Sequence, residues 1–162
     1  MAATGSGGVI AVIEERLTEL GIELPSAPPP VASYVPVRVA DGLAFVAGQI
    51  PLEAGEVLSA GRLGAGVTLE QGAEAARRCA LQALSALRDA LGSLDRVRHI
   101  VKVEVFVASA PGFVDQPKVA NGASDALVEI LGDAGRHARA AVGVAELPLG
   151  ASVEVAIVAA VD

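Results

Sequence analysis

Two isolated charges near the C-terminus have residue types and spacing that could do chemistry. Arg139 opens a segment of small apolar residues, and Glu154 is the single acid in a second apolar segment. The segments are joined by Leu147–Gly150, a Leu-Pro-Leu-Gly sequence that is typical of a turn. Burying an unpaired guanidinium or carboxylate is costly. The two charges therefore predict a binding site.

The spacing suggests what this site could hold. If the turn makes the two segments a hairpin, Gly143 lies opposite Glu154, and both face the same side as Arg139. Arg139 and Glu154 are then separated by about 13 Å along the strands, since each residue advances about 3.3 Å. The side chains of Arg139 and Glu154 lean towards each other and leave a gap for a small anion and a water. Only Ala141 and Gly143 lie between the two charges on that face. The alternative is an edge-strand arginine and an acid paired with another base, and spacing does not choose between the two.

The sequence lacks the motifs of metal sites, nucleophilic hydrolases and phosphate-binding loops. The chain has two histidines, His99 and His137, and no Cys-x-x-Cys pair, so we expect no metal site. We find no nucleophile elbow and no phosphate-binding glycine loop, and we expect no cofactor. Cys79, the single cysteine, lies beside the apolar face of a predicted helix, where packing is its expected role.

Composition narrows the class of protein further. The net charge of −7 should repel nucleic acid. No apolar run reaches the roughly 20 residues of a membrane helix, and the start lacks the features of a signal peptide. A single cysteine suits a reducing compartment. We therefore expect a cytoplasmic protein that binds neither nucleic acid nor membrane.

Hydrophobic periodicity predicts one domain that follows an N-terminal extension. After a flexible start at residues 1–8, helices are expected at 9–20, 69–91 with Thr68 as N-cap, and 111–131 beginning near Pro117. Strands are expected at 37–40 and 43–47 around the Asp41-Gly42 turn, and at 97–107, 139–147 and 151–161. In the 97–107 strand, alternation places Val101, Val103, Val105 and Val107 on one face. A proline-rich linker covers residues 24–36. This order predicts an α+β fold, an antiparallel or mixed sheet with both helices on one face.

The same segments resemble a known family. The motifs are Tyr34 with Ala47-Gly48-Gln49-Ile50-Pro51, then Val119-Ala120-Asn121-Gly122, then Arg139-x-x-Val-x-Val-x-x-Leu-Pro followed by Val153-Glu154-Val155. They resemble the YjgF-like, or reactive intermediate deaminase (Rid), family, formerly called the L-PSP endoribonuclease family. The resemblance implies a chorismate-mutase-like fold of the bacillary type, a bacterial homotrimer with clefts between subunits. It covers a domain at residues 34–162, and residues 1–33 fall outside the usual core.

The resemblance also implies roles for individual residues. Arg139 matches the arginine that grips the substrate carboxylate, a bidentate task that suits a guanidinium. Glu154 matches the acid that positions a water for attack on an imine carbon. Tyr34 and Asn121 match residues that line the cleft, and Gly48 matches a backbone position close to the ligand. The implied activity is metal-free hydrolytic deamination of 2-imino or enamine acids, such as 2-aminoacrylate products.

Two positions depart from the family pattern. Ala47 stands where many members have serine, and Ala141 stands where many have cysteine. Both changes remove a small polar group, which predicts a drier pocket. A trimer that binds a small carboxylate such as a 2-oxo acid without turnover is therefore the alternative function. RNA cleavage rests on the older family label, and the acidic charge and few aromatic residues oppose it.

Overall fold

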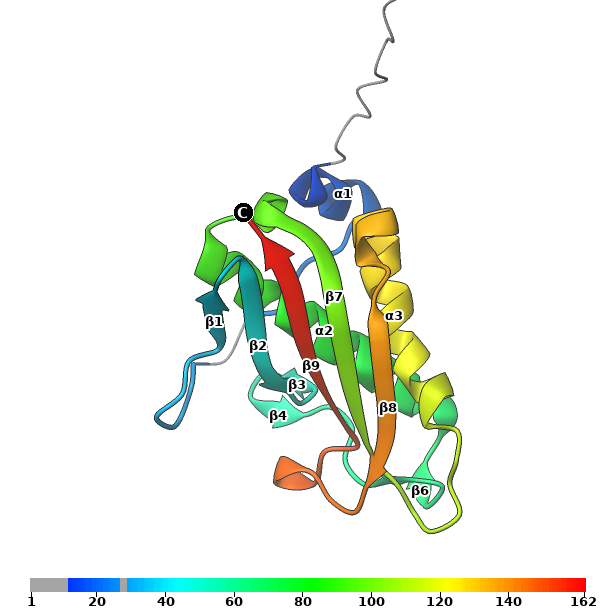
Figure 1. The fold of residues 1–162 in the computed structure, drawn as a ribbon. Coiled ribbons are helices and arrows are strands. Elements are labelled where there is room, and N and C mark those ends of the chain that lie inside the picture. Colours follow the sequence, from blue (N-terminus) through cyan, green and yellow to red (C-terminus); the bar gives the residue numbers. More distant parts are fainter. Residues whose placement is uncertain (1–11, 27–28) are drawn as a thin grey trace, which may run out of the picture.

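The chain folds into a five-stranded mixed sheet. The computed structural model describes residues 12–26 and 29–162. The strand order is β1-β2-β9-β7-β8, with β7 and β8 parallel and the other neighbours antiparallel (Figure 1). The strands are β1 (Val37–Ala40), β2 (Leu43–Gln49), β7 (Val97–Ala108), β8 (Ala138–Val144) and β9 (Val153–Val161). Short strands β3 (Leu52–Glu53), β4 (Glu56–Val57), β5 (Arg62–Leu63) and β6 (Gly66–Val67) form two small sheets.

Two long helices cover one face of the sheet and leave the other face open. These are α2 (Leu69–Leu91) and α3 (Gln116–Leu131), which lie behind the sheet in Figure 1. Alternate residues of β9, Val153, Val155 and Ile157, are buried on the helix side. The α+β architecture predicted from the periodicity is confirmed. The remaining helical elements are α1 (Ile13–Leu20), η1 (Leu94–Arg96), η2 (Gly132–Gly135) and η3 (Pro148–Gly150).

The ends and contacts of α2 follow from its sequence. The Thr68 hydroxyl accepts from the Gln71 N–H at 3.1 Å, and the Gln71 side chain accepts from the Thr68 N–H at 2.9 Å. This capping box satisfies two donors at the helix start, as predicted for Thr68. Cys79 is fully buried, so its predicted packing role is confirmed. Burial raises the pKa of its thiol and keeps it neutral.

Glycine sets how closely α3 approaches α2. A β-carbon at Gly122 would lie 3.0 Å from Ala73 Cα and closer still to the Ala73 carbonyl. Only a glycine allows the two helix backbones to touch at this point. The contact fixes the part of α3 that carries Asn121 and Ser124.

The predicted alternation of β7 is partly wrong. Its register against β9 shifts between Val97 and His99 and again between Ile100 and Lys102. Each shift rotates the following residues relative to the helix layer. Ile100 is therefore buried, whereas Val101 is 38% exposed on the open face. Val103, Val105 and Val107 are buried as predicted.

The predicted pairing of the two closing strands is also wrong. β8 pairs with β7, and β9 lies on the other side of β7, between β7 and β2. The connection at residues 145–152 is long enough to cross β7. Its backbone hydrogen bonds join it to residues 59 and 61 instead of pairing β8 with β9. Ser152 N–H donates to the Ser59 carbonyl at 3.0 Å, and Gly61 N–H donates to the Gly150 carbonyl at 2.9 Å. Gly143 thus lies beside Val107, not beside Glu154.

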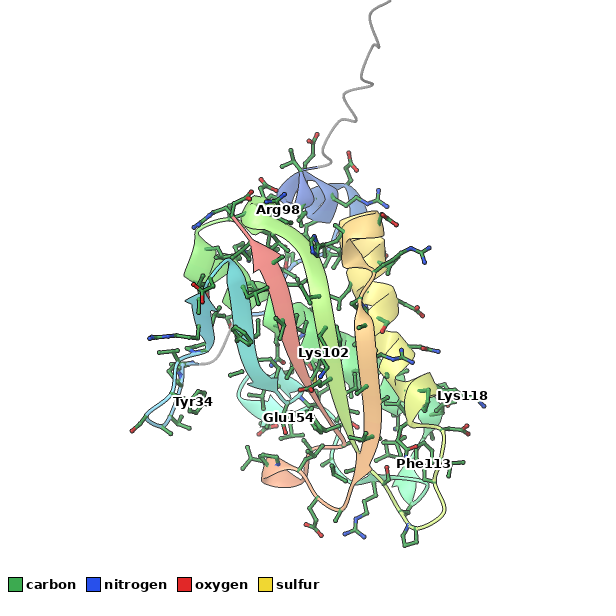
Figure 2. The ribbon with its side chains drawn as sticks, in the orientation of Figure 1. Tyr34, Arg98, Lys102, Phe113, Lys118 and Glu154 are labelled. Carbon is green, nitrogen blue, oxygen red and sulfur yellow. The ribbon has the colours of Figure 1, made fainter. Side chains whose placement is uncertain are left out.

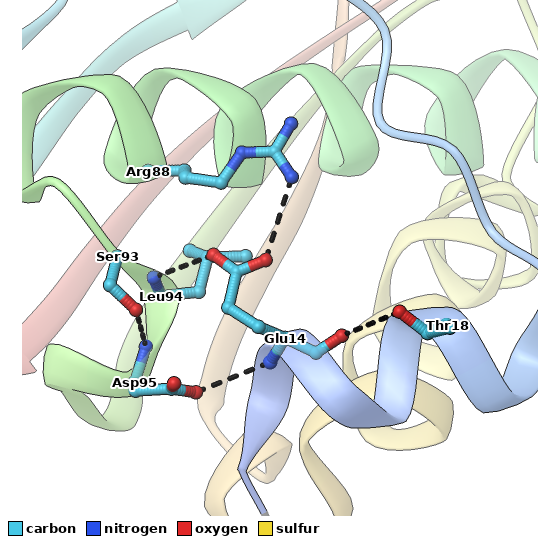
Figure 3. Close-up of polar contacts among 6 residues, drawn as sticks. All are labelled: Glu14, Thr18, Arg88, Ser93, Leu94 and Asp95. Carbon is cyan, nitrogen blue, oxygen red and sulfur yellow. Dashed lines mark hydrogen bonds and ion pairs between the residues drawn. The ribbon is translucent and has the colours of Figure 1, made fainter.

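The N-terminal helix packs against the end of the domain. The predicted residues 9–11 of this helix lie outside the described part of the chain, and α1 begins at Ile13. Glu14 accepts from the Leu94 N–H at 3.1 Å and pairs with Arg88 at 3.5 Å, while Asp95 accepts from the Glu14 N–H at 3.2 Å (Figure 3). Ile13 and Leu17 are buried in the main core. This helix therefore belongs to the packed structure.

Candidate functional site

The predicted site residues fall into two groups. Tyr34, Gly48 and Glu154 line one cavity of about 450 Å³. Figure 2 shows Tyr34 on the segment beside β1 and Glu154 on β9. Arg139 and Asn121 meet elsewhere, where β8 passes α3, and a hydrogen bond of 2.9 Å joins them. Within one chain, the structure thus builds two half-sites.

The cavity is lined mainly by apolar groups. Its walls come from the proline-rich segment, the Ala47–Gln49 end of β2 with the following Ile50, and the η3 turn, where Leu149 adopts a left-handed backbone with φ 56°. Gln82, from α2, supports the floor: its side chain accepts from the Leu52 N–H at 2.8 Å and donates to the Ile50 carbonyl at 2.9 Å. Gln82 was not among the predicted residues. An amide within an otherwise apolar helix face was the signal that could have indicated it.

A β-bulge places Gly48 against Glu154. Val46 pairs with Ile157 and Gln49 pairs with Val155, so Ala47 and Gly48 both lie opposite the single residue Ala156. A β-carbon at Gly48 would lie 2.9 Å from the carboxyl carbon of Glu154 and closer to its Oε1. Bulges are frequent next to active sites because they redirect the backbone. Here the bulge places the backbone of Gly48, which has no side chain, against the carboxylate of Glu154.

Glu154 is a half-buried acid without a cationic partner. Among residues 12–26 and 29–162, no lysine, arginine or histidine forms an ion pair with it. Removal from water disfavours the charged form and raises its pKa above the ordinary glutamate value of 4.5. A shifted acid in a cleft is a common property of general acid–base groups. Glu154 is therefore suited to exchanging protons with a ligand or water.

Arg139 is held by α3 and keeps part of its guanidinium available. Its Nη1 donates to Asn121 Oδ1 at 2.9 Å and to Ser124 Oγ at 3.1 Å, and Nη2 donates to the Pro117 carbonyl at 3.3 Å. A guanidinium has five N–H groups, and these bonds use three of them. Within the described chain the Nε–H forms no hydrogen bond, so the Nε–Nη2 edge can receive a carboxylate in a bidentate manner.

The two half-sites lie on opposite faces of the sheet. Arg139 is aligned with the buried Val103 and points to the helix side, whereas Glu154 is aligned with Phe106 and points to the open side. Two strand spacings across and three residues along separate their Cα atoms by about 14 Å. The prediction that both charges face one gap in a hairpin is wrong, because β7 lies between them. One chain alone cannot bring both groups to a small ligand.

The two alanines that depart from the family pattern lie in different surroundings. Ala47 lines the cavity beside Glu154, so its missing hydroxyl removes a polar group from that wall. Ala141 packs against the core on the helix side of β8. Among the described residues, no three His, Cys, Asp or Glu side chains gather as metal ligands do. No helix in that part of the chain is both long and apolar enough to cross a membrane.

Comparison with known proteins decides the family. The family described as "YjgF/chorismate mutase-like, putative endoribonuclease" matches residues 14–161, nearly the whole chain. The chain belongs to the YjgF/chorismate mutase-like family. The family fold agrees with the mixed sheet and its two helices. The match begins within α1, the helix that packs on the domain.

Members of this YjgF-like family resemble the chain over nearly its full length. Protein TCP17 of Trypanosoma cruzi is 47% identical over 156 residues, 96% of this chain and 95% of that protein. The crystal structure of Atu1372 from Agrobacterium tumefaciens, of unknown function, matches with a TM-score of 0.86 at 44% identity, covering 93% and 92% of the two chains. TdcF of E. coli, solved with bound serine, matches with a TM-score of 0.59 at 24% identity, covering 84% and 94%. At that identity the TdcF likeness concerns the fold alone.

Proposed function

We propose that this YjgF-like protein hydrolyses 2-imino and enamine acids, such as 2-aminoacrylate products, in clefts between the subunits of a homotrimer. The observation that carries the proposal is Glu154, an acid with a raised pKa that pairs with no cation among residues 12–26 and 29–162 and lies in a mainly apolar cavity beside the Gly48 backbone. Such a group can take a proton from water and return it at a pH where an ordinary glutamate stays charged.

The reaction needs few groups. The substrate carboxylate binds the free edge of Arg139, which fixes the imine carbon. Glu154 accepts a proton from water as the oxygen bonds to that carbon and the C=N π electrons move to nitrogen. Proton transfer to nitrogen and collapse of the tetrahedral adduct break the C–N bond. The products are ammonia and a 2-oxo acid, which together balance the imine and one water. Tyr34, Gly48 and Asn121 line the two halves of the cleft.

The separation of the two half-sites supports the proposed assembly of several copies. Because Arg139 and Glu154 point to opposite faces, Arg139 of one subunit is proposed to complete the Glu154 cavity of its neighbour. The open face carries exposed apolar side chains, among them Phe45 and Val142, which suits burial by another copy. A head-to-tail contact closes into a ring only when the rotation between neighbours returns to the first copy, and closure after three copies is what we propose here.

TdcF, which shares the fold of this chain, was solved with serine bound. Serine carries a nitrogen and a carboxylate on one carbon, as a 2-imino acid does. Because the likeness concerns the fold alone, the proposal rests on the residues of this chain and not on TdcF.

A coupled assay tests the proposal. An amino-acid oxidase generates the imine, and its disappearance is followed with and without the purified protein. We expect acceleration by wild type and loss of the added rate in Arg139→Ala and Glu154→Ala. Arg136→Ala is the matched control, because Arg136 is exposed and pairs only with Asp133 at 3.4 Å among the described residues. A wild-type protein that does not accelerate imine hydrolysis would contradict the proposal.

The second candidate is a trimer that binds a 2-oxo acid without turnover. Ala47 favours it, because the cavity wall beside Glu154 lacks the hydroxyl found in many members. Calorimetry separates the two functions. Binding of a 2-oxo acid that is lost in Arg139→Ala, with no imine hydrolysis by wild type, supports the binding function. Binding that survives in Arg139→Ala excludes it.

A further inference from the structure

Arg139 lies at the end of a chain of hydrogen bonds that the proposed reaction does not use. Ser124 Oγ accepts from Arg139 Nη1 at 3.1 Å and lies 2.9 Å from His137 Nε2. His137 Nδ1 lies 2.6 Å from the Gly135 carbonyl oxygen. The chain links β8, α3 and the η2 turn. Ser124 and His137 are both partly buried, whereas Arg139 is exposed.

For a neutral His137 ring, the donor and acceptor capacities of these groups set the direction of every bond. A carbonyl oxygen only accepts, so the hydrogen between His137 and Gly135 lies on Nδ1. In a neutral ring, Nε2 is then an acceptor, and the Ser124 hydroxyl donates to it. The Ser124 oxygen keeps its lone pairs for Arg139. Each group thus donates to the next, from Arg139 through Ser124 and His137 to Gly135.

We propose that Ser124 and His137 are positioning residues that orient Arg139 for the carboxylate. An exposed arginine side chain has many rotamers, and fixing one costs conformational entropy on ligand binding. Ser124 alone could rotate its hydroxyl away from this geometry. The His137 acceptor holds the hydroxyl, so the serine lone pairs stay directed at Nη1. The Nε–Nη2 edge is then presented to the ligand before it binds. This inference rests on the proposed role of Arg139 as the carboxylate anchor.

The tautomer of His137 tests the bond direction without any ligand. Nitrogen NMR of the full chain distinguishes an imidazole with Nδ1–H from one with Nε2–H. The imidazole signals come only from His99 and His137. The variant His137→Leu assigns them. We expect His137 to carry its hydrogen on Nδ1, and we expect Ser124→Ala to shift its Nε2 resonance. Asp125→Ala, an exposed neighbour on α3, should leave that resonance unchanged. A hydrogen on Nε2, or no shift in Ser124→Ala, overturns the relay.

Calorimetry with pyruvate tests the consequence for binding. Ser124→Ala and His137→Leu should each weaken pyruvate binding roughly three- to tenfold, the effect of one net hydrogen bond. Because both variants break the same chain, the double variant should be no weaker than either single variant. Ser124→Thr keeps the hydroxyl and should restore affinity, and Asp125→Ala should bind as wild type does. Thermal unfolding of each variant accounts for any loss of fold.

The outcomes separate this inference from the proposed function. If Arg139→Ala abolishes binding while Ser124→Ala and His137→Leu bind as wild type does, the positioning role is wrong and the anchor role stands. Additive losses in the double variant also overturn the relay. If Arg139→Ala binds pyruvate as well as wild type, the anchor role fails, and the positioning role fails with it.

Discussion

At the level of single residues, Glu154 and Gly48 form one steric unit. The carboxylate occupies the space that any side chain at position 48 needs. The bulge in β2 creates this contact, and apolar walls keep the carboxylate partly out of water. The chemistry of Glu154 therefore depends on a residue that has no side chain.

Gly48→Ala should disable the site through Glu154. The new methyl group displaces the carboxylate, and a displacement of about 1 Å in a catalytic group can cost roughly a hundredfold in rate. We expect imine hydrolysis to fall by that order and the thermal midpoint to fall as well. In a Glu154→Ala background the methyl has room, so adding Gly48→Ala should cost little stability. An equal cost in both backgrounds would show that Glu154 is not the steric partner.

Glu154→Gln should change the pH dependence of stability and of turnover. Burial raises the pKa of Glu154, so the folded state binds its proton more tightly than the unfolded state does. That contribution is complete below the ordinary glutamate pKa and is lost as pH rises through the folded pKa. Relative to wild type, Glu154→Gln should therefore gain stability as pH rises towards neutrality. Wild-type turnover should rise with pH as Glu154 loses its proton, since the carboxylate is the base.

Urea denaturation across that pH range and the imine assay measure the two effects. Glu53→Gln, an exposed acid in β3, is the control and should follow wild type. If the stability difference between Glu154→Gln and wild type does not change with pH, burial does not raise the pKa of Glu154 in the folded protein.

At the level of elements, local signals predicted most of the fold. The spacing of apolar residues and the Thr68 N-cap correctly predicted α2. The Asp41-Gly42 turn correctly predicted the hairpin of β1 and β2. The insertion of β7 between β8 and β9 was missed because pairing depends on contacts distant in sequence. The bulges in β2 and β7 were missed because they leave the composition of a strand unchanged. The roles given to the candidate site residues stay predictions, whereas their predicted arrangement in one hairpin is wrong because β7 lies between β8 and β9.

Glu14→Ala should loosen α1 from the domain. The Glu14 carboxylate accepts a hydrogen bond from the Leu94 N–H and forms an ion pair with Arg88. Each of these interactions contributes about 1 kcal/mol to the free energy of unfolding. We expect a loss of roughly 1–2 kcal/mol in the free energy of unfolding and faster proteolysis within α1. Glu15→Ala is the matched control, because Glu15 is exposed on the same helix turn. Equal effects of the two variants would contradict a specific clamp by Glu14.

At the level of the whole molecule, the proposed reaction requires assembly of several chains. Arg139, the proposed anchor, and Glu154, the proposed proton-transfer group, lie on opposite faces of one sheet. Under the proposed function, residues 12–26 and 29–162 of one chain therefore do not bring the two groups to one ligand. The proposed trimer provides the complete site by placing one half-site of each subunit against the other half-site of its neighbour. Light scattering of the purified protein should accordingly give three times the chain mass.

Complementation between the Arg139→Ala and Glu154→Ala variants tests whether two subunits share each cleft. Arg139→Ala and Glu154→Ala chains are unfolded together, mixed in equal amounts and refolded, so that mixed trimers form. A cleft is intact when its Arg139 comes from one variant and its Glu154 from the other, which random assembly in a ring gives in about a quarter of the clefts. If the clefts are shared between subunits, imine hydrolysis should return to about a quarter of the wild-type rate. Mixed trimers as inactive as either parent, beside a wild-type sample that regains activity after the same treatment, would contradict it.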